Sequence, residues 1–207
     1  MIRYTKLKNH EILSLVAASA VLRKEKILEQ LISVAKSKNI PFRKVYETLL
    51  QNYLFTGYPS AINSLKILKK FYPGKQIPKS EDMNLYHFKN RGEVNCRQVY
   101  GNKYEKLISN ISNFSPELSE WLVLEGYGKV LGRKGLSFKE RELCIVAVLS
   151  ALKFEDQLYS HINGAYRLKA TVPELISVIE NLTLIGGKNY SAFGLRVLKR
   201  FIIRKGM

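Results

Sequence analysis

The sequence is poor in the residues on which much enzyme chemistry depends. Its 207 residues include two cysteines, three histidines and one tryptophan. Cys96 and Cys144 do not form a Cys-x-x-Cys motif, which argues against a disulfide framework and against a dithiol redox site. Cys144 lies within an apolar run, where a thiol is most often a small buried residue. No cluster of potential metal ligands is visible, so we expect no bound metal.

Acidic residues are also scarce. Seventeen Asp and Glu stand against 34 Lys and Arg, which gives a formal net charge of +17. Such a charge attracts anions of several kinds, including nucleic acid, anionic lipid and small metabolites. The basic residues are spread over the faces of predicted helices, which is typical of a solvated surface. We therefore do not expect a nucleic-acid partner.

Long apolar runs are missing too, and no stretch is long enough to span a membrane. The hydrophobic content of 46% nevertheless excludes disorder and allows a substantial core. Near the N-terminus, basic residues precede the apolar stretch 12–22 and imitate a secretory signal. A matching stretch at 143–152 lies deep in the chain, which favours a core helix in both places. We expect a cytoplasmic protein that has no membrane partner.

What the sequence does contain is a match to itself. Shifted by 130 positions, residues 13–71 align without a gap on residues 143–201, with identities at 14 of 59 positions. Most of the identities are apolar residues or glycine, as expected when one fold is used twice and its surface varies freely. A polar residue that occurs in only one of the two segments therefore needs a reason other than folding.

Both segments are predicted to be helical, because apolar residues recur at helical spacing and no stretch alternates with period two. The predicted class is all-α. Two further helices are expected between the segments, and the second should turn Trp121, Leu124 and Tyr127 toward the core. The helices are predicted at about 10–24, 25–38, 42–55, 59–72, 101–112, from 115, 138–153, 154–169, from 172, and 189–204.

The glycine-rich run 126–135 looks at first like a phosphate-binding loop. It lacks the Gly-Lys-Ser/Thr ending of a Walker loop, and no strand precedes it as in a dinucleotide-binding unit. We expect its glycines to permit close packing and a sharp helix end instead.

His161 and Glu142 are the sharpest candidates for chemistry. Their counterparts in the first segment are Leu31 and Ile12, so two apolar positions have become an imidazole and an acid. If the two helices form an antiparallel hairpin, the carboxylate can hold one imidazole nitrogen and make the other a general base. The alternative is a structural His–Glu pair.

Arg133 and Arg91 are further candidates, for binding an anion. An arginine beside a glycine-rich helix end suits a carboxylate substrate, although a lone arginine is usually a surface residue.

A series of short motifs runs from residue 91 to residue 174: Arg91-Gly-x-Val94, Arg97-x-Val99-x-Gly101, Glu125-Gly-Tyr-Gly128, Arg133-Lys-Gly-Leu-Ser137, Lys139-x-Arg-Glu-Leu143, Gln157-Leu-x-x-His161 and Val172-Pro-Glu174. Through these motifs the chain resembles the carboxymuconolactone decarboxylase family, which includes the alkylhydroperoxidase D proteins. The resemblance covers about 90–201 and implies an all-α bundle of two repeated units, the first degenerate, that assembles into trimeric or hexameric rings. A chain with two units could form a trimer that imitates a six-unit ring.

The resemblance also implies roles for residues. Glu142 and His161 fall on the family's proton relay, whereas the two cysteines of its peroxidase branch are replaced here by Phe154 and Gln157. Without a thiolate there is no cysteine-based reduction of peroxide. The decarboxylase branch needs neither cysteine nor cofactor, and its substrate is a small carboxylated lactone that Arg133 could hold.

We therefore expect three regions: a degenerate N-terminal helical repeat at 1–72, a linker at 73–90, and a carboxymuconolactone decarboxylase-like domain at 91–207. The favoured function is that of a lyase-like enzyme, free of cofactors, that acts on a small anionic metabolite and forms homo-oligomers. The alternative is a family member that lost the cysteine pair and serves as a non-catalytic ring-forming or binding protein.

Overall fold

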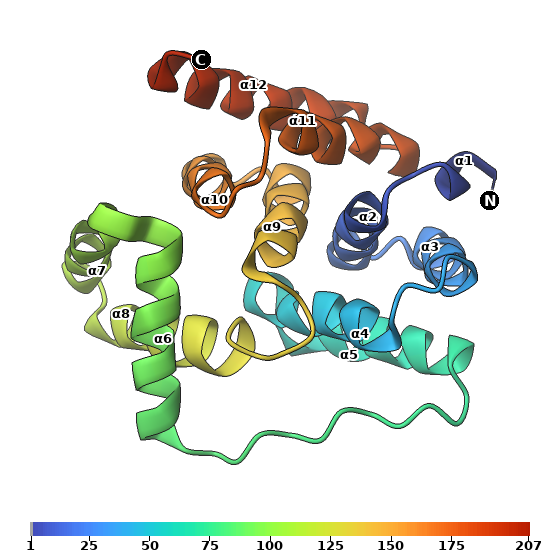
Figure 1. Ribbon diagram of the computed structural model, residues 1–207, viewed down its shortest axis with the longest axis horizontal. Helices are drawn as coiled ribbons and strands as arrows, with labels where there is room; N and C mark the ends of the chain where they lie inside the picture. The colour runs from blue at the N-terminus through green and yellow to red at the C-terminus, as the bar shows by residue number, and fades with distance from the viewer. Residues whose placement is uncertain (1) are drawn as a thin grey trace. The chain divides into compact units, whose positions relative to one another are not determined.

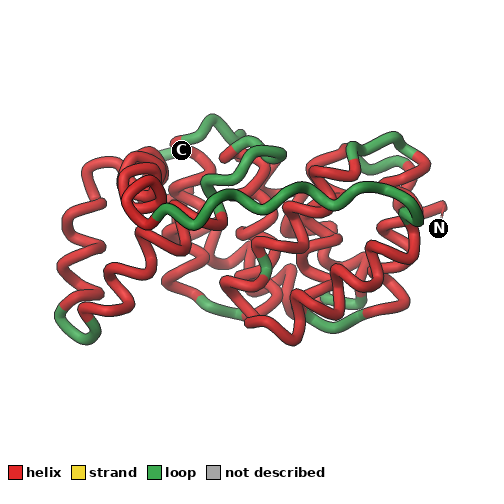
Figure 2. Tube along the Cα trace, turned by 90° about the horizontal axis from the view of Figure 1, so that it is seen from below, coloured by secondary structure: helices red, strands yellow, loops and turns green. Residues whose placement is uncertain are grey.

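The computed structural model describes the backbone from Ile2 to Met207 and side chains from Tyr4 onward. Over these residues the chain forms helices and loops without a strand, which confirms the all-α class (Figure 2). The elements in chain order are α1 (Ile2–Thr5), α2 (Asn9–Val21), α3 (Glu25–Ser37), α4 (Phe42–Gln51), α5 (Tyr53–Phe71), α6 (Leu85–Tyr100), η1 (Gly101–Lys103), α7 (Tyr104–Ser112), α8 (Pro116–Trp121), η2 (Leu122–Val130), α9 (Phe138–Leu152), α10 (Glu155–Arg167), α11 (Val172–Glu180), η3 (Asn181–Ile185) and α12 (Lys188–Lys205).

The helices group into two compact units. The first unit combines residues 1–77 with residues 135–207, and the second consists of residues 78–134. Helix α6 begins at Leu85, inside the segment 73–90 predicted to be a linker, and α6 as a whole is absent from the helices predicted from the sequence. Asn84 starts this helix by accepting a hydrogen bond from the His87 N–H at 2.8 Å, a cap that the polar composition around it conceals.

Within the first unit, the helices of the first segment recur 130 positions later. Helix α3 spans Glu25–Ser37 and α10 spans Glu155–Arg167, so both bounds differ by 130. The non-glycine residues with positive φ among the described residues show the same spacing. They are Arg23 (54°) with Lys153 (60°) and Asn39 (55°) with Lys169 (67°). Equivalent helices are thus joined by turns of the same backbone conformation.

Helices α2 and α9 form the centre of this unit. They pack against each other, and α9 also contacts α10, α11 and α12 (Figure 1). Both are buried along most of their length, as expected of helices surrounded by others and not amphipathic at a surface. Ser137 begins α9 with the predicted capping box, in which its hydroxyl and the Glu140 carboxylate bind each other's backbone N–H groups.

The second unit is built on α6 and the π-helix η2, which meet at backbone contact. A Cβ atom added to Gly92 would lie 2.0 Å from the Val123 carbonyl oxygen, and one added to Gly128 would lie 2.0 Å from the Phe88 carbonyl oxygen. Only glycine permits this approach, so the close packing predicted for the glycine-rich run is confirmed at Gly128.

The prediction that Trp121 faces the core is wrong. Its side chain is 55% exposed, whereas Tyr127 is buried as predicted. At 100° per residue, six positions place Trp121 and Tyr127 about 120° apart, so even a regular helix cannot point both side chains in one direction. The buried face is the one that carries Tyr127.

No helix in the part of the chain that the structure describes is both long enough and apolar enough to cross a membrane.

Candidate functional site

The structure brings Glu142 and His161 together in the first unit. Glu142 lies in the first half of α9, His161 lies in the middle of α10, and the two helices pack against each other. The Nδ1 atom of His161 is 2.8 Å from Oε2 of Glu142. Glu142 is fully buried and His161 is 9% exposed. The contact predicted across the helix hairpin is therefore present.

The turn between α9 and α10 produces this pairing. Lys153 ends α9 in the left-handed conformation, with φ of 60°, and α10 begins two residues later at Glu155. A turn this short returns the chain antiparallel to itself, so residues at similar distances from the turn lie side by side. Glu142 and His161, 19 positions apart, meet across it.

The bond geometry defines what the pair can do. A neutral imidazole that donates its Nδ1 proton to a carboxylate keeps Nε2 as a proton acceptor, and the carboxylate stabilises the imidazolium that forms when Nε2 takes up a proton. The second carboxylate oxygen of Glu142, Oε1, is buried and has no hydrogen-bond partner among the described residues. Oε1 of Glu142 can therefore accept a hydrogen bond from a further donor.

The first segment shows that the fold does not require these polar groups. Ile12 and Leu31, the counterparts of Glu142 and His161, are both fully buried. Burying a polar group without full hydrogen bonding costs about 1–3 kcal/mol. Replacing two buried apolar residues with a partly satisfied acid and imidazole is therefore unfavourable for folding alone, and this favours a functional reason for the pair.

Arg133 lies in the other compact unit, in the turn after η2, and is half-buried there. The predicted site residues are therefore divided between the two units, with the Glu142–His161 pair in one and Arg133 in the other. Arg91, another arginine of the second unit, has a structural role. Its Nε donates to the Gly128 carbonyl at 2.8 Å, and its Nη2 lies 2.7 Å from a Glu81 carboxylate oxygen.

The cysteines take no visible part in chemistry. Both are free thiols and are fully buried. Burial raises the pKa of the Cys144 thiol from 9.0 to about 12, so the nucleophilic thiolate is absent near neutral pH. Phe154 and Gln157, which stand at the positions of the peroxidase cysteines in the resemblance, are both exposed. No group of three or more His, Cys, Asp or Glu side chains that could hold a metal occurs among the described residues.

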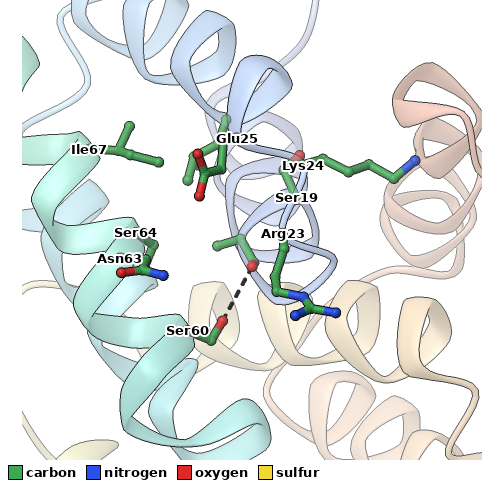
Figure 3. A pocket seen from close by; sticks show the side chains of 10 residues that line it. Ser19, Arg23, Lys24, Glu25, Ser60, Asn63, Ser64 and Ile67 are labelled. Carbon is green, nitrogen blue, oxygen red and sulfur yellow. Dashed lines mark hydrogen bonds between the residues drawn. The ribbon is translucent and has the colours of Figure 1, made fainter.

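A separate cavity lies in the first segment, between the end of α2, the start of α3 and α5 (Figure 3). Ser60, Asn63 and Ser64 of α5 line it together with Glu25, and Ser60 donates to the Ala20 carbonyl at 3.3 Å. Its volume of about 20 Å³ has room for about one water molecule. Sites for small organic ligands are more than tenfold larger, at about 300 Å³ or more, so this cavity cannot hold a carboxylated lactone.

The sequence interpretation missed a buried polar cluster next to Glu142. Arg141 is 1% exposed and donates to Gln51 Oε1 at 3.0 Å, and it lies 3.5 Å from Oε2 of the fully buried Glu47. Two signals could have found it. Arg141 shares a helix face with the apolar residues Ile145 and Leu149, and Glu47 and Gln51 are four residues apart, hence on the same face of α4.

Comparisons with known proteins agree with this description. Residues 116–200 match the model of the carboxymuconolactone decarboxylase family. The chain is 28% identical over 174 residues to peroxisomal protein 2 of Schizosaccharomyces pombe, with 80% of each chain covered. It is 30% identical over 91 residues to 4-carboxymuconolactone decarboxylase of Acinetobacter baylyi, which covers 44% of this chain and 68% of that enzyme. The matches, the all-α fold and the paired Glu142 and His161 lead to one conclusion: the chain belongs to the carboxymuconolactone decarboxylase family.

Proposed function

We propose that the chain is a cofactor-independent enzyme of the decarboxylase-like branch, acting on a small carboxylated or lactone-type metabolite. The observation that carries the proposal is the buried 2.8 Å contact between His161 Nδ1 and Glu142 Oε2, at two positions where the first segment has leucine and isoleucine. His161 transfers the proton through Nε2, and Glu142 orients the ring and stabilises its charged form. The match to 4-carboxymuconolactone decarboxylase of A. baylyi supports this choice of substrate class.

Arg133 is proposed to hold a carboxylate of the substrate, because its planar guanidinium can donate two parallel hydrogen bonds. The net charge of +17 supports an anionic substrate, since a positive field raises the local concentration of anions. The buried, protonated Cys144 and the residues Phe154 and Gln157 speak against cysteine-based reduction of peroxide.

We further propose that the chain consists of two tandem units, a degenerate one at 1–72 and a complete one at 91–207, and that the segment 73–90 between them includes the start of α6. Helix bounds and turn conformations recur at a spacing of 130 residues, which supports a common origin of the two units. The assembly is proposed to be a homo-oligomer, either a trimer with six units or a hexamer, located in the cytoplasm.

Turnover measurements on a panel of muconolactones test the enzymatic proposal. We expect His161→Ala to lower kcat by about 10²–10⁴-fold, the usual contribution of a positioned acid–base group. Leu31→Ala is the matched control, because it empties a similar volume at the equivalent buried position and should retain kcat. Equal rates for wild type and His161→Ala, or no turnover of any member of the panel, would contradict the proposal.

The second candidate is a non-catalytic ring-forming or binding protein. This candidate is favoured by the match to peroxisomal protein 2, because the match covers 80% of both chains and the name of that protein states no reaction. Isothermal titration with small dicarboxylates separates the two candidates. Binding that depends on Arg133, together with zero turnover across the panel, would support the binding protein.

A further inference from the structure

The first half of α9 is attached to the first segment of the chain by the residues just before Glu142. Glu140 pairs with Lys44 of α4, and Arg141 donates to Gln51 of the same helix. Arg141 also pairs with Glu47, whose other carboxylate oxygen lies 2.8 Å from Arg43 Nε. Consecutive residues of α9 are thus held by one helix of the opposite segment.

The arginine contact is unusually well buried. Arg141, Glu47 and Gln51 are each exposed by 1% or less, and Arg141 is among the largest side chains that are fully buried. A buried ion pair is a poor source of stability, because the desolvation of two charges offsets most of their attraction. Its best-attested use is to fix one register of packing against alternatives. The buried pair therefore indicates that α9 must be held in one position against α4.

The internal comparison shows that the fold can do without this cluster. The equivalent of Arg141 in the first segment is Glu11, whose carboxylate accepts from the Lys8 N–H at 2.7 Å and so caps its own helix. Ser177, the equivalent of Glu47, donates to the Glu174 carbonyl one turn earlier in its own helix. The polar cluster accompanies only the helix that also carries Glu142.

We infer that α4 of the first segment is the positioning element for the His161–Glu142 pair: Glu47 and Gln51 hold Arg141 and thereby fix the rotation of α9 that aims Glu142 at His161. The inference rests on the proposed function for its catalytic meaning. Adjacent residues of an α-helix point about 100° apart, so Arg141 can be held by α4 while Glu142 faces α10. This gives the degenerate segment a role in the site although it lacks the pair itself.

A small rotation of α9 is enough to misplace the Glu142 carboxylate. A carboxylate about 6 Å from the helix axis moves by about 1 Å when the helix rotates by about 10°. A displacement of about 1 Å at a catalytic group can lower the rate about 10²-fold. Glu47, Gln51 and Arg141 are therefore positioning residues, which act on the substrate only through Glu142 and His161.

The test replaces the whole cluster by apolar residues of similar size, Glu47→Met, Gln51→Leu and Arg141→Met in one protein. Such a replacement preserves burial, so we expect a folded protein of undiminished thermal stability. The readout is the pair of imidazole ¹⁵N chemical shifts of His161, which report the hydrogen bond at Nδ1 without any substrate. Glu142→Gln gives the reference for a lost carboxylate partner.

We expect the His161 shifts of the triple variant to move more than halfway from the wild-type values to those of Glu142→Gln, and kcat to fall about 10²-fold. Lys139→Met is the matched control, since it removes a 2.8 Å ion pair between the first turn of α9 and Glu174 of α11. It should leave both shifts unchanged. Wild-type shifts in the triple variant would overturn the inference, and so would an unfolded triple variant, which would make the cluster a source of stability. Absence of turnover in the wild type would contradict the proposed function alone.

Discussion

Ser14 and Cys144 touch each other, although 130 positions separate them in the chain. The Ser14 hydroxyl lies 4.0 Å from the Cys144 sulfur, at the buried contact of α2 with α9. The same 130 positions relate the two matching segments, so each residue meets its own counterpart. A local twofold axis brings equivalent residues of two copies together, so this contact supports the proposal that the two segments are repeated units.

The burial of Cys144 leads to a prediction about alkaline pH. The pKa of its thiol is raised from 9.0 to about 12 because burial disfavours the thiolate. The stabilising effect of a raised pKa is complete below the unfolded value and is lost as pH rises toward the folded one. Between about pH 9 and 12 the free energy of unfolding should therefore fall more steeply in wild type than in Cys144→Ala, by up to about 4 kcal/mol in total.

Urea unfolding at several pH values measures this difference. Lysines and tyrosines also titrate in this range, but they are the same in both proteins, so the difference between the two slopes isolates the thiol. Parallel pH profiles would show that Cys144 is accessible to solvent in the folded protein.

The Glu142–His161 pair leads to a second prediction, about coupling. His161→Leu leaves a buried carboxylate without its partner and should lower the free energy of unfolding by about 3–5 kcal/mol. The double variant Glu142→Ile/His161→Leu restores the apolar residues of the first segment. It should be at least as stable as wild type, because replacing a buried polar pair by packed apolar side chains is often neutral or stabilising by about 1–4 kcal/mol.

A double-mutant cycle in urea evaluates the coupling between the two sites. If the double variant gains stability and loses turnover, the pair is retained for activity. Additive losses from the two single variants would contradict the coupling and the direct contact on which the proposed mechanism depends.

The reverse substitution tests whether the first segment accepts the same pair. Ile12→Glu and Leu31→His each place an unpartnered polar group at a fully buried position and should each cost about 3 kcal/mol or more. Because α2 and α3 correspond to α9 and α10, the double variant should be more stable than the sum of the single losses predicts. Urea unfolding of the three proteins checks this, and strictly additive losses would argue against equivalent hairpins.

The sequence predicts the helices of the first unit well because each signal occurs twice. Apolar periods and turn positions recur after 130 residues, so one segment corroborates the other, and α3 and α10 have the same length. The His161–Glu142 contact follows from the same logic, since one short turn between two helices determines which residues meet.

Features that depend on pairing between distant helices escape prediction. Local signals can mark Arg141 and Glu47 as polar residues on buried helix faces, but the two are 94 positions apart and nothing local specifies that they meet. The exposure of Trp121 escapes prediction because the side chains of Trp121 and Tyr127 point about 120° apart, and the sequence does not show which of the two faces packs against α6. Helix α6 as a whole escapes prediction because its cap, Asn84, lies among other polar residues and few apolar residues mark its period.

The glycines of η2 provide a last prediction within a single short segment. Gly128→Ala would bring a Cβ atom to 2.0 Å from the Phe88 carbonyl oxygen, so α6 and η2 would have to separate. Gly126, two residues earlier in the same helix, meets only a Leu122 methyl group at 3.9 Å. We expect Gly128→Ala to destabilise the second unit by about 3 kcal/mol or more, the upper range for overpacking. Gly126→Ala should be neutral or stabilising by up to about 1 kcal/mol.

Fluorescence of Trp121, the single tryptophan of the chain and part of the second unit, follows the unfolding of this unit in both variants. Equal unfolding midpoints would show that α6 and η2 do not approach through Gly128.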